Sequence, residues 1–187
     1  MNADATQKIR LIMYLRQQGI HSTDVLSAIE RTPRESFIPA MFHDQAYEDL
    51  ALPIGRGQTI SQPLIVGIMT QFLNLKKNMR VLEIGTGSGY HTYILSQLAR
   101  FVYTIERHKP LLFKSEKIFR KLNVSNIFSK HDDGGLGWKA QAPFDRIIVT
   151  ASAPEIPKNL LNQLSEDGIM IIPVGDDYSD QVLKKIK

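Results

Sequence analysis

The amino-acid sequence predicts an α/β protein with a mostly parallel, doubly wound sheet that helices cover on both faces. Three observations predict this fold class. From residue 79 onward, short apolar runs alternate with stretches of helical spacing, as in strand–helix–strand units. One of these runs leads into three glycines at alternate positions and then into a helix, a connection typical of ligand-binding sheets. A chain of 187 residues also suits one domain with a single core.

The first 78 residues are predicted to form helices and one long loop. Apolar spacing indicates a helix over residues 5–18 and a second one that begins after Ser22. Residues 32–63 are rich in proline and glycine, and so long a loop in a compact domain is either functional or poorly ordered. Helical spacing resumes over residues 63–75. The buried faces of the first two helices are expected to hold Ile9, Ile12, Met13 and Leu15, and then Val25, Leu26 and Ile29.

The second part of the chain is predicted to supply the sheet. Ligands of such sheets bind at the carboxyl ends of the strands, near the switch in strand order. We therefore expect the chemistry just after Ile84, Glu106, Lys130 and Thr150. Strands are expected at 80–84, 101–106, 126–130, 144–150 and 168–174, and helices at 90–98, 110–122 and 157–164.

The sharpest local signal is the segment VLEIGTGSGY at 81–90, with Gly85, Gly87 and Gly89 after an apolar strand. Glycines there permit a tight turn and a close approach of the backbone to a ligand. The spacing differs from the G-x-G-x-x-G of dinucleotide binders. Glu83, two positions before the first glycine, suits a ligand with a cationic amino group better than a pyrophosphate. The alternative is a plain strand-to-helix turn.

Two further acidic positions follow the next strands. Glu106 ends the second strand, where a carboxylate can accept hydrogen bonds from both hydroxyls of a ribose. Its alternative is a solvated carboxylate at a strand end. After the third strand, the run Asp132-Asp133-Gly134 could receive the exocyclic amine of adenine, although an Asp-Gly pair alone is more often a bare turn.

Composition excludes several classes of protein. Apolar residues make up 43% of the chain, with no run of the ~18–20 residues that a membrane span needs, and no secretory signal is evident. The absence of cysteine excludes disulfides and thiolate metal sites and fits a cytoplasmic protein. The net charge of +4 comes from dispersed lysines and arginines, so we expect no nucleic-acid partner. The five histidines lack metal-ligand spacing and are interpreted as surface or structural residues.

Taken together, the motifs resemble those of class I S-adenosylmethionine-dependent methyltransferases with a Rossmann-like fold. Within that class they resemble the protein-L-isoaspartate O-methyltransferases, from about residue 8 to the end. The most specific block is RGQTISQP at 56–63. Other matching blocks are PRESF at 33–37, YED at 47–49, LPIG at 52–55, GW at 137–138, APFD at 142–145, APEIP at 153–157 and IPVG at 172–175.

The resemblance implies a cytoplasmic repair enzyme that takes its methyl group from S-adenosyl-L-methionine and acts on isoaspartyl-containing proteins and peptides. It implies one domain over 1–187, with a substrate loop in 1–78 and a cofactor-binding core in 79–187. Ser61 corresponds to the active-site residue, although a serine before Pro63 could also cap a helix. Asp132 stands where the family has a glycine, which puts the geometry of Asp133 in question. The implied substrate contacts are Gln58, Thr59, Ile60 and Ser61, and the implied cofactor contacts are Glu83, Gly85, Gly87, Gly89, Glu106, Asp133 and Gly134, with no metal.

The chemistry of the implied reaction explains why no catalytic triad is evident. A carboxylate is already ionised at pH 7 and needs no strong base to attack a sulfonium methyl group. Two other functions stay open. One is a class I methyltransferase of another acceptor, although TASA at 150–153 lacks the N-P-P-Y of amino-directed nucleic-acid methyltransferases. The other is a non-catalytic relative that only binds the cofactor. Trp138 is interpreted as a packing residue.

The C-terminal end departs from the family pattern. Family members usually continue further and add an antiparallel strand beside the fifth strand. We therefore expect this strand to be missing, with the strand at 168–174 left open along one edge and prone to pairing with another chain. Val182, Leu183 and Ile186 are expected to be poorly buried. The resulting prediction is a marginally stable, weakly active monomer that can self-associate through this edge.

Overall fold

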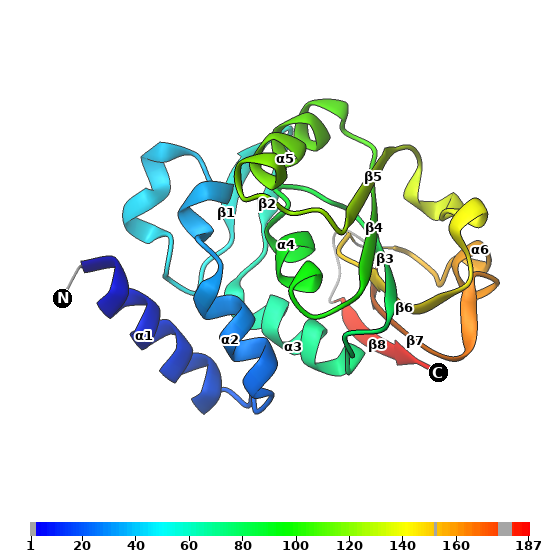
Figure 1. The fold of residues 1–187 in the computed structure, drawn as a ribbon, viewed down its shortest axis with the longest axis horizontal. Helices are drawn as coiled ribbons and strands as arrows, with labels where there is room; N and C mark the ends of the chain where they lie inside the picture. The colour runs from blue at the N-terminus through cyan, green and yellow to red at the C-terminus, as the bar shows by residue number, and fades with distance from the viewer. Residues whose placement is uncertain (1–2, 152, 176–180) are drawn as a thin grey trace.

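A six-stranded sheet forms the centre of the computed structural model, which describes residues 3–151, 153–175 and 181–187 (Figure 1). The strand order is β5-β4-β3-β6-β7-β8; the first five strands run parallel, and β8 is antiparallel to β7. After β5 the chain crosses β3 to form β6, so the strand order switches between β3 and β6. The strands are β3 (Arg80–Ile84), β4 (Phe101–Glu106), β5 (Ile127–His131), β6 (Phe144–Val149), β7 (Leu164–Val174) and β8 (Val182–Ile186).

Helices cover both faces of this sheet, as the sequence predicts. Figure 1 shows α4 and α5 against one face with α1 and α2 outside them, and α6 on the opposite side. The buried strand residues alternate accordingly: Val81 packs with Leu73 of α3 and Leu95 of α4, whereas Leu82 packs with Leu160 of α6. The helices are α1 (Ala3–Gln17), α2 (Thr23–Arg31), α3 (Pro63–Leu73), α4 (Tyr90–Ser96), α5 (Lys109–Lys121) and α6 (Lys158–Leu161). No helix in the described ranges is long and apolar enough to cross a membrane.

The buried face of α1 is narrower than the sequence predicts. Leu11 and Leu15 are buried and Ile12 is partly buried, whereas Ile9 and Met13 are 48% and 58% exposed. The prediction for Ile9 and Met13 is therefore wrong. Because α1 packs mainly on α2, only the side chains one helical turn apart on a single stripe reach the core.

The predicted long loop at 32–63 is ordered into short elements. It contains the 3-10 helices η1 (Arg34–Phe37) and η2 (Ala40–Gln45) and a hairpin of β1 (Leu52–Gly55) and β2 (Gln58–Ile60). Arg56 and Gly57 form its turn with φ of 57° and 69°. Positive φ at both central residues is the geometry of the tight turns that suit twisted hairpins. The hairpin carries residues 58–61 toward the ends of the central strands.

The expectation of an open edge at 168–174 is wrong. β8 pairs antiparallel with β7 along the whole run from Met170↔Ile186 to Val174↔Val182, so β7 has a neighbour on each side. Leu183 and Ile186 are partly buried, on opposite faces of the sheet, whereas Val182 is 59% exposed. The link at 176–180 lies outside the described residues. Along the described edge, Lys184 and Lys185 disfavour pairing with another strand.

Candidate active site

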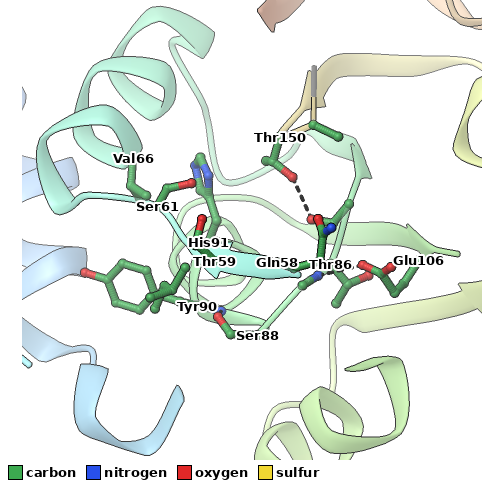
Figure 2. A pocket seen from close by; sticks show the side chains of 14 residues that line it. Gln58, Thr59, Ser61, Val66, Thr86, Ser88, Tyr90, His91, Glu106 and Thr150 are labelled. Carbon is green, nitrogen blue, oxygen red and sulfur yellow. Dashed lines mark hydrogen bonds between the residues drawn. The ribbon is translucent and has the colours of Figure 1, made fainter. Parts of the chain in front are cut away.

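A cavity opens where the carboxyl ends of β3, β4 and β6 meet the β1–β2 hairpin (Figure 2). The segment after β3, Glu106 at the end of β4 and Thr150 after β6 form one wall; residues 58–61 form the other. The sequence predicts chemistry at the ends of four strands, and three of them contribute to this wall. The strand end at Lys130 is the exception, since neither Lys130 nor the residues just after it line the cavity. A second hollow of about 330 Å³ lies between η1 and α5 and shares Gly87 and Ser88 with the cavity.

The glycine turn requires glycine for packing at its two ends. A Cβ on Gly85 would lie 2.6 Å from Thr150 Oγ1, and one on Gly89 would lie 2.7 Å from the ring of Phe119 on α5. Gly87 instead faces open space, with Ile54 the nearest neighbour at 3.6 Å, and it lines the cavity with Gly85. The turn therefore presents bare backbone to a ligand at its centre, and Gly89 serves the contact between α4 and α5.

Glu106 is held at the edge of the cavity by backbone donors. The side chain is 5% exposed, its Oε2 accepts from Gly87 N at 2.8 Å, and its Oε1 accepts from His108 N at 2.8 Å. A carboxylate oxygen can accept more than one hydrogen bond. Both oxygens thus keep capacity for two neighbouring hydroxyl groups, which fits the predicted contact with a ribose.

Glu83 is fully buried and does not line the cavity. Its Oε2 accepts from Thr92 Oγ1 at 2.5 Å and from Thr104 Oγ1 at 2.7 Å, while its Oε1 has no partner among the described residues. Burial raises the pKa of Glu83 to about 8, with the nearby Glu106 charge adding to the rise and the two threonine hydrogen bonds opposing it. Thr104 in turn contacts Thr86 Oγ1 at 2.7 Å, and Thr86 lines the cavity. Glu83 therefore reaches the cavity only through two hydroxyl groups, an arrangement that favours an indirect role over the predicted direct contact with a cationic amino group.

Ser61 has its backbone anchored and its hydroxyl free. The N-cap of α3 is Gln62, and Asp49 Oδ1 accepts from Leu64 N at 2.8 Å, so Asp49 caps this helix in place of Ser61. The carbonyl of Ser61 accepts from Arg34 Nη2 at 3.0 Å. Its hydroxyl makes no hydrogen bond with any described residue and points toward the His91 ring in Figure 2. The capping role considered from sequence is thus taken by another residue.

His91 is the main site residue that sequence reasoning missed. It is 8% exposed and lines the cavity, and its Nε2 lies 2.8 Å from Thr70 Oγ1. Because the Thr70 hydroxyl donates to the Val66 carbonyl at 2.7 Å, its oxygen can only accept from His91 Nε2–H. Nδ1 is then the acceptor nitrogen, and burial lowers the pKa of His91 to about 3, so the ring is neutral. The available signal was its position directly after the glycine turn.

Six further residues line the cavity. Thr86, Ser88 and Tyr90 lie in the segment 81–90 and Thr150 and Ala151 lie at the end of the strand at 144–150, both places where the sequence predicts chemistry, whereas Val66 on α3 could be found only in the folded chain.

The segment after β5 lies outside the cavity. Asp133 is exposed and caps η3 (Gly134–Leu136), with its Oδ1 accepting from Gly135 N at 2.9 Å. Asp132, which replaces a family glycine, accepts from Asp133 N and pairs with Lys130 at 2.5 Å. Gly134 packs on Ile84, and a Cβ there would lie 2.2 Å from Ile84 Cγ2. The predicted ligand contacts of Asp133 and Gly134 stay predictions. Trp138 packs edge-on against Tyr103, in agreement with its interpretation as a packing residue.

The sheet order, the glycine turn after β3 and the buried acid at the end of β4 define a class I S-adenosylmethionine-dependent methyltransferase. The fold alone is shared with a precorrin-6y C5,15-methyltransferase of Geobacter metallireducens, at a TM-score of 0.57 and 16% identity over 66% of this chain and 68% of that one.

Within this class, the chain belongs to the protein-L-isoaspartate O-methyltransferase family. The family model described as Protein-L-isoaspartate(D-aspartate) O-methyltransferase (PCMT) matches residues 6–187. A relative of that name from Rhodospirillum centenum is 55% identical over 98% of this chain and 83% of its own length. One from Photobacterium profundum is 52% identical over 97% and 86%. A Plasmodium falciparum structure, described as this enzyme in complex with S-adenosyl-L-homocysteine, has a TM-score of 0.82 at 29% identity over 94% of this chain and 87% of that one.

Proposed function

We propose that this methyltransferase transfers the methyl group of S-adenosylmethionine to the free carboxylate of L-isoaspartyl residues in damaged proteins and peptides. The family supports this reaction. The observation that carries the assignment of the site is that one cavity joins the family-specific block at 58–61 to the glycine turn and Glu106. The parts 1–78 and 79–187 each supply a wall, and we treat the chain as one methyltransferase domain.

The residues after β3 and β4 fit the cofactor, which supplies an electrophilic methyl group on a sulfonium. The open backbone at Gly87 admits close approach, and the Glu106 carboxylate has free acceptor capacity for the ribose hydroxyls. Glu83 supports this wall from below through Thr104 and Thr86. We assign direct cofactor contact to Gly85, Gly87 and Glu106 and a supporting role to Glu83 and Gly89.

The hairpin wall receives the substrate carboxylate. The Ser61 hydroxyl, which has no hydrogen-bond partner among the described residues, donates to one carboxylate oxygen and orients the other toward the methyl group, while Gln58, Thr59 and Ile60 bound the space. No lysine or arginine is among the described residues that line the cavity, and His91 is neutral. The attacking carboxylate is therefore not held by a cation, which preserves its charge for reaction.

The setting of this reaction follows from charge and composition. We infer that the protein works in the cytoplasm as a monomer, without a nucleic-acid or membrane partner. The support is the cysteine-free sequence, the dispersed basic residues and the lysines along β8.

A paired-peptide assay tests the proposed function. The protein is incubated with radiolabelled S-adenosylmethionine and a peptide that contains one isoaspartyl residue, beside the same peptide with aspartate. Base-labile label on the isoaspartyl peptide alone is the expected result. Label on neither peptide, with cofactor binding intact by calorimetry, would show a non-catalytic relative. Equal label on both peptides would show a methyltransferase with a different acceptor.

A further inference from the structure

Arg34 lies at the centre of the segment that carries the hairpin. It is 1% exposed, and its guanidinium donates four hydrogen bonds to backbone carbonyls. Nη1 donates to Ala46 O at 3.4 Å and Glu48 O at 3.1 Å, and Nη2 donates to Leu50 O at 2.9 Å and Ser61 O at 3.0 Å. Three of these carbonyls precede β1 and the fourth follows β2. One side chain thus joins the two ends of the hairpin.

A second set of contacts holds the same segment from the other side. Asp49 caps α3 at Leu64 N, and the Gln62 side chain donates to the Asp49 carbonyl at 3.1 Å. Ser61 is therefore fixed through its own carbonyl by Arg34 and through the next residue by Asp49. The position of its hydroxyl in the cavity depends on both attachments.

The surroundings of Arg34 suit a guanidinium and not another cation. Burial lowers the pKa of Arg34, while Tyr90, Asp49 and Tyr47 act in the opposite direction. The guanidinium lies 5.3 Å from the centre of the Tyr90 ring, and Tyr90 lines the cavity. A planar fork of donors can reach four separate carbonyls, whereas the single nitrogen of lysine has three donors at one point.

We infer that Arg34 is a positioning residue for methyl transfer, which sets the wall at 58–61 against the glycine turn without touching the substrate. The inference rests on the proposed function, because it takes residues 58–61 as the substrate side. A shift of the hairpin by ~1 Å would misplace the carboxylate, and such displacements can lower rates by about 100-fold.

Arg34→Lys tests this role, and Arg146→Lys is its matched control. Arg146 is 7% exposed and donates to the carbonyls of Leu73, Asp145 and Asp167 near the amino end of β6, away from the cavity. Both variants should lose thermal stability. Only Arg34→Lys should lower kcat/KM for an isoaspartyl peptide, by about 10- to 100-fold, with S-adenosylmethionine affinity within about threefold of the parent. Hydrogen exchange should rise at 46–61 in Arg34→Lys alone.

Equal falls in kcat/KM in the two variants at equal loss of melting temperature would overturn the inference, as would unchanged exchange at 46–61. Raised exchange at 46–61 with loss of cofactor affinity and an unchanged KM for the peptide would also overturn it, because the hairpin would then position the cofactor. The proposed function is tested separately by the parent protein in the paired-peptide assay. Transfer there together with a fully active Arg34→Lys would leave the function standing and remove only the role of Arg34.

Discussion

Replacement of Glu106 by alanine is the most direct test of the cofactor wall. The structure leaves both carboxylate oxygens able to accept from the ribose hydroxyls, and hydrogen bonds to a charged group contribute about 1.5–3 kcal/mol each. The net loss of cofactor-binding free energy should be smaller than the sum of two such bonds. In the free protein the Glu106 carboxylate already accepts from Gly87 N and His108 N, and it shares its oxygens between these donors and the ribose. We expect a net cost of about 2–3 kcal/mol, a ~30- to 150-fold rise in the dissociation constant of S-adenosylmethionine.

Isothermal titration calorimetry of the parent and variant measures this constant directly. Glu106→Gln keeps the side-chain volume and one acceptor oxygen, so its dissociation constant for S-adenosylmethionine should lie between those of the parent and Glu106→Ala. Circular dichroism checks that the overall secondary structure survives the change. An unchanged constant in a folded Glu106→Ala would refute the reasoning and remove Glu106 from the cofactor site.

Three other expectations concern the hydroxyl, the buried acid and the edge of the sheet. Ser61→Ala should lower turnover of an isoaspartyl peptide by about 5- to 150-fold for a lost hydrogen bond, while cofactor affinity stays within about threefold; equal falls in both would contradict its substrate role. Folding raises the pKa of Glu83 to about 8, so the contribution of its protonated form to stability is present below pH ~4.5 and is lost as pH rises toward 8. Glu83→Gln cannot ionise, so between pH 5 and 8 its melting temperature should fall less than that of the parent protein. Removal of residues 181–187 should lower the melting temperature by about 2–8 °C for ~1–2 kcal/mol and promote self-association visible by light scattering, whereas an unchanged monomer would show that β8 adds nothing.

The central strands were the most predictable part of the fold. The predicted bounds of β3 and β4 agree with the structure because both strands are buried on both faces and their apolar runs are continuous. The strand β8 was not predicted, because its sequence is short and lysine-rich and it becomes a strand only through its ladder with β7. The face of α1 was partly wrong for the same reason: which apolar side chains are covered depends on where α2 lies.

The candidate active site also has parts that could be predicted from the sequence and parts that could not. Local spacing was sufficient to identify the glycine turn and Glu106, because backbone conformation and strand ends are encoded by neighbouring residues, whereas the block at 58–61 was identified through the resemblance to the family. The resemblance added the cofactor and the substrate. Local spacing could not show that Glu83 is sealed beneath the cavity, since its partners Thr92 and Thr104 come from α4 and β4. A direct contact of Glu83 with the ligand and a supporting role beneath the cavity are both compatible with the sequence of this five-residue strand.

By itself the sequence determined the fold class, the family and the segments that hold the chemistry, because those signals lie within short stretches of chain. Only the tertiary structure decided which side chains face the cavity and in what state. His91 becomes a neutral acceptor through Thr70, 21 residues away, and Arg34 fixes Ser61 across 27 residues. Contacts between distant residues set burial, and burial sets protonation and hydrogen-bond direction, so these properties exist only once the chain has folded.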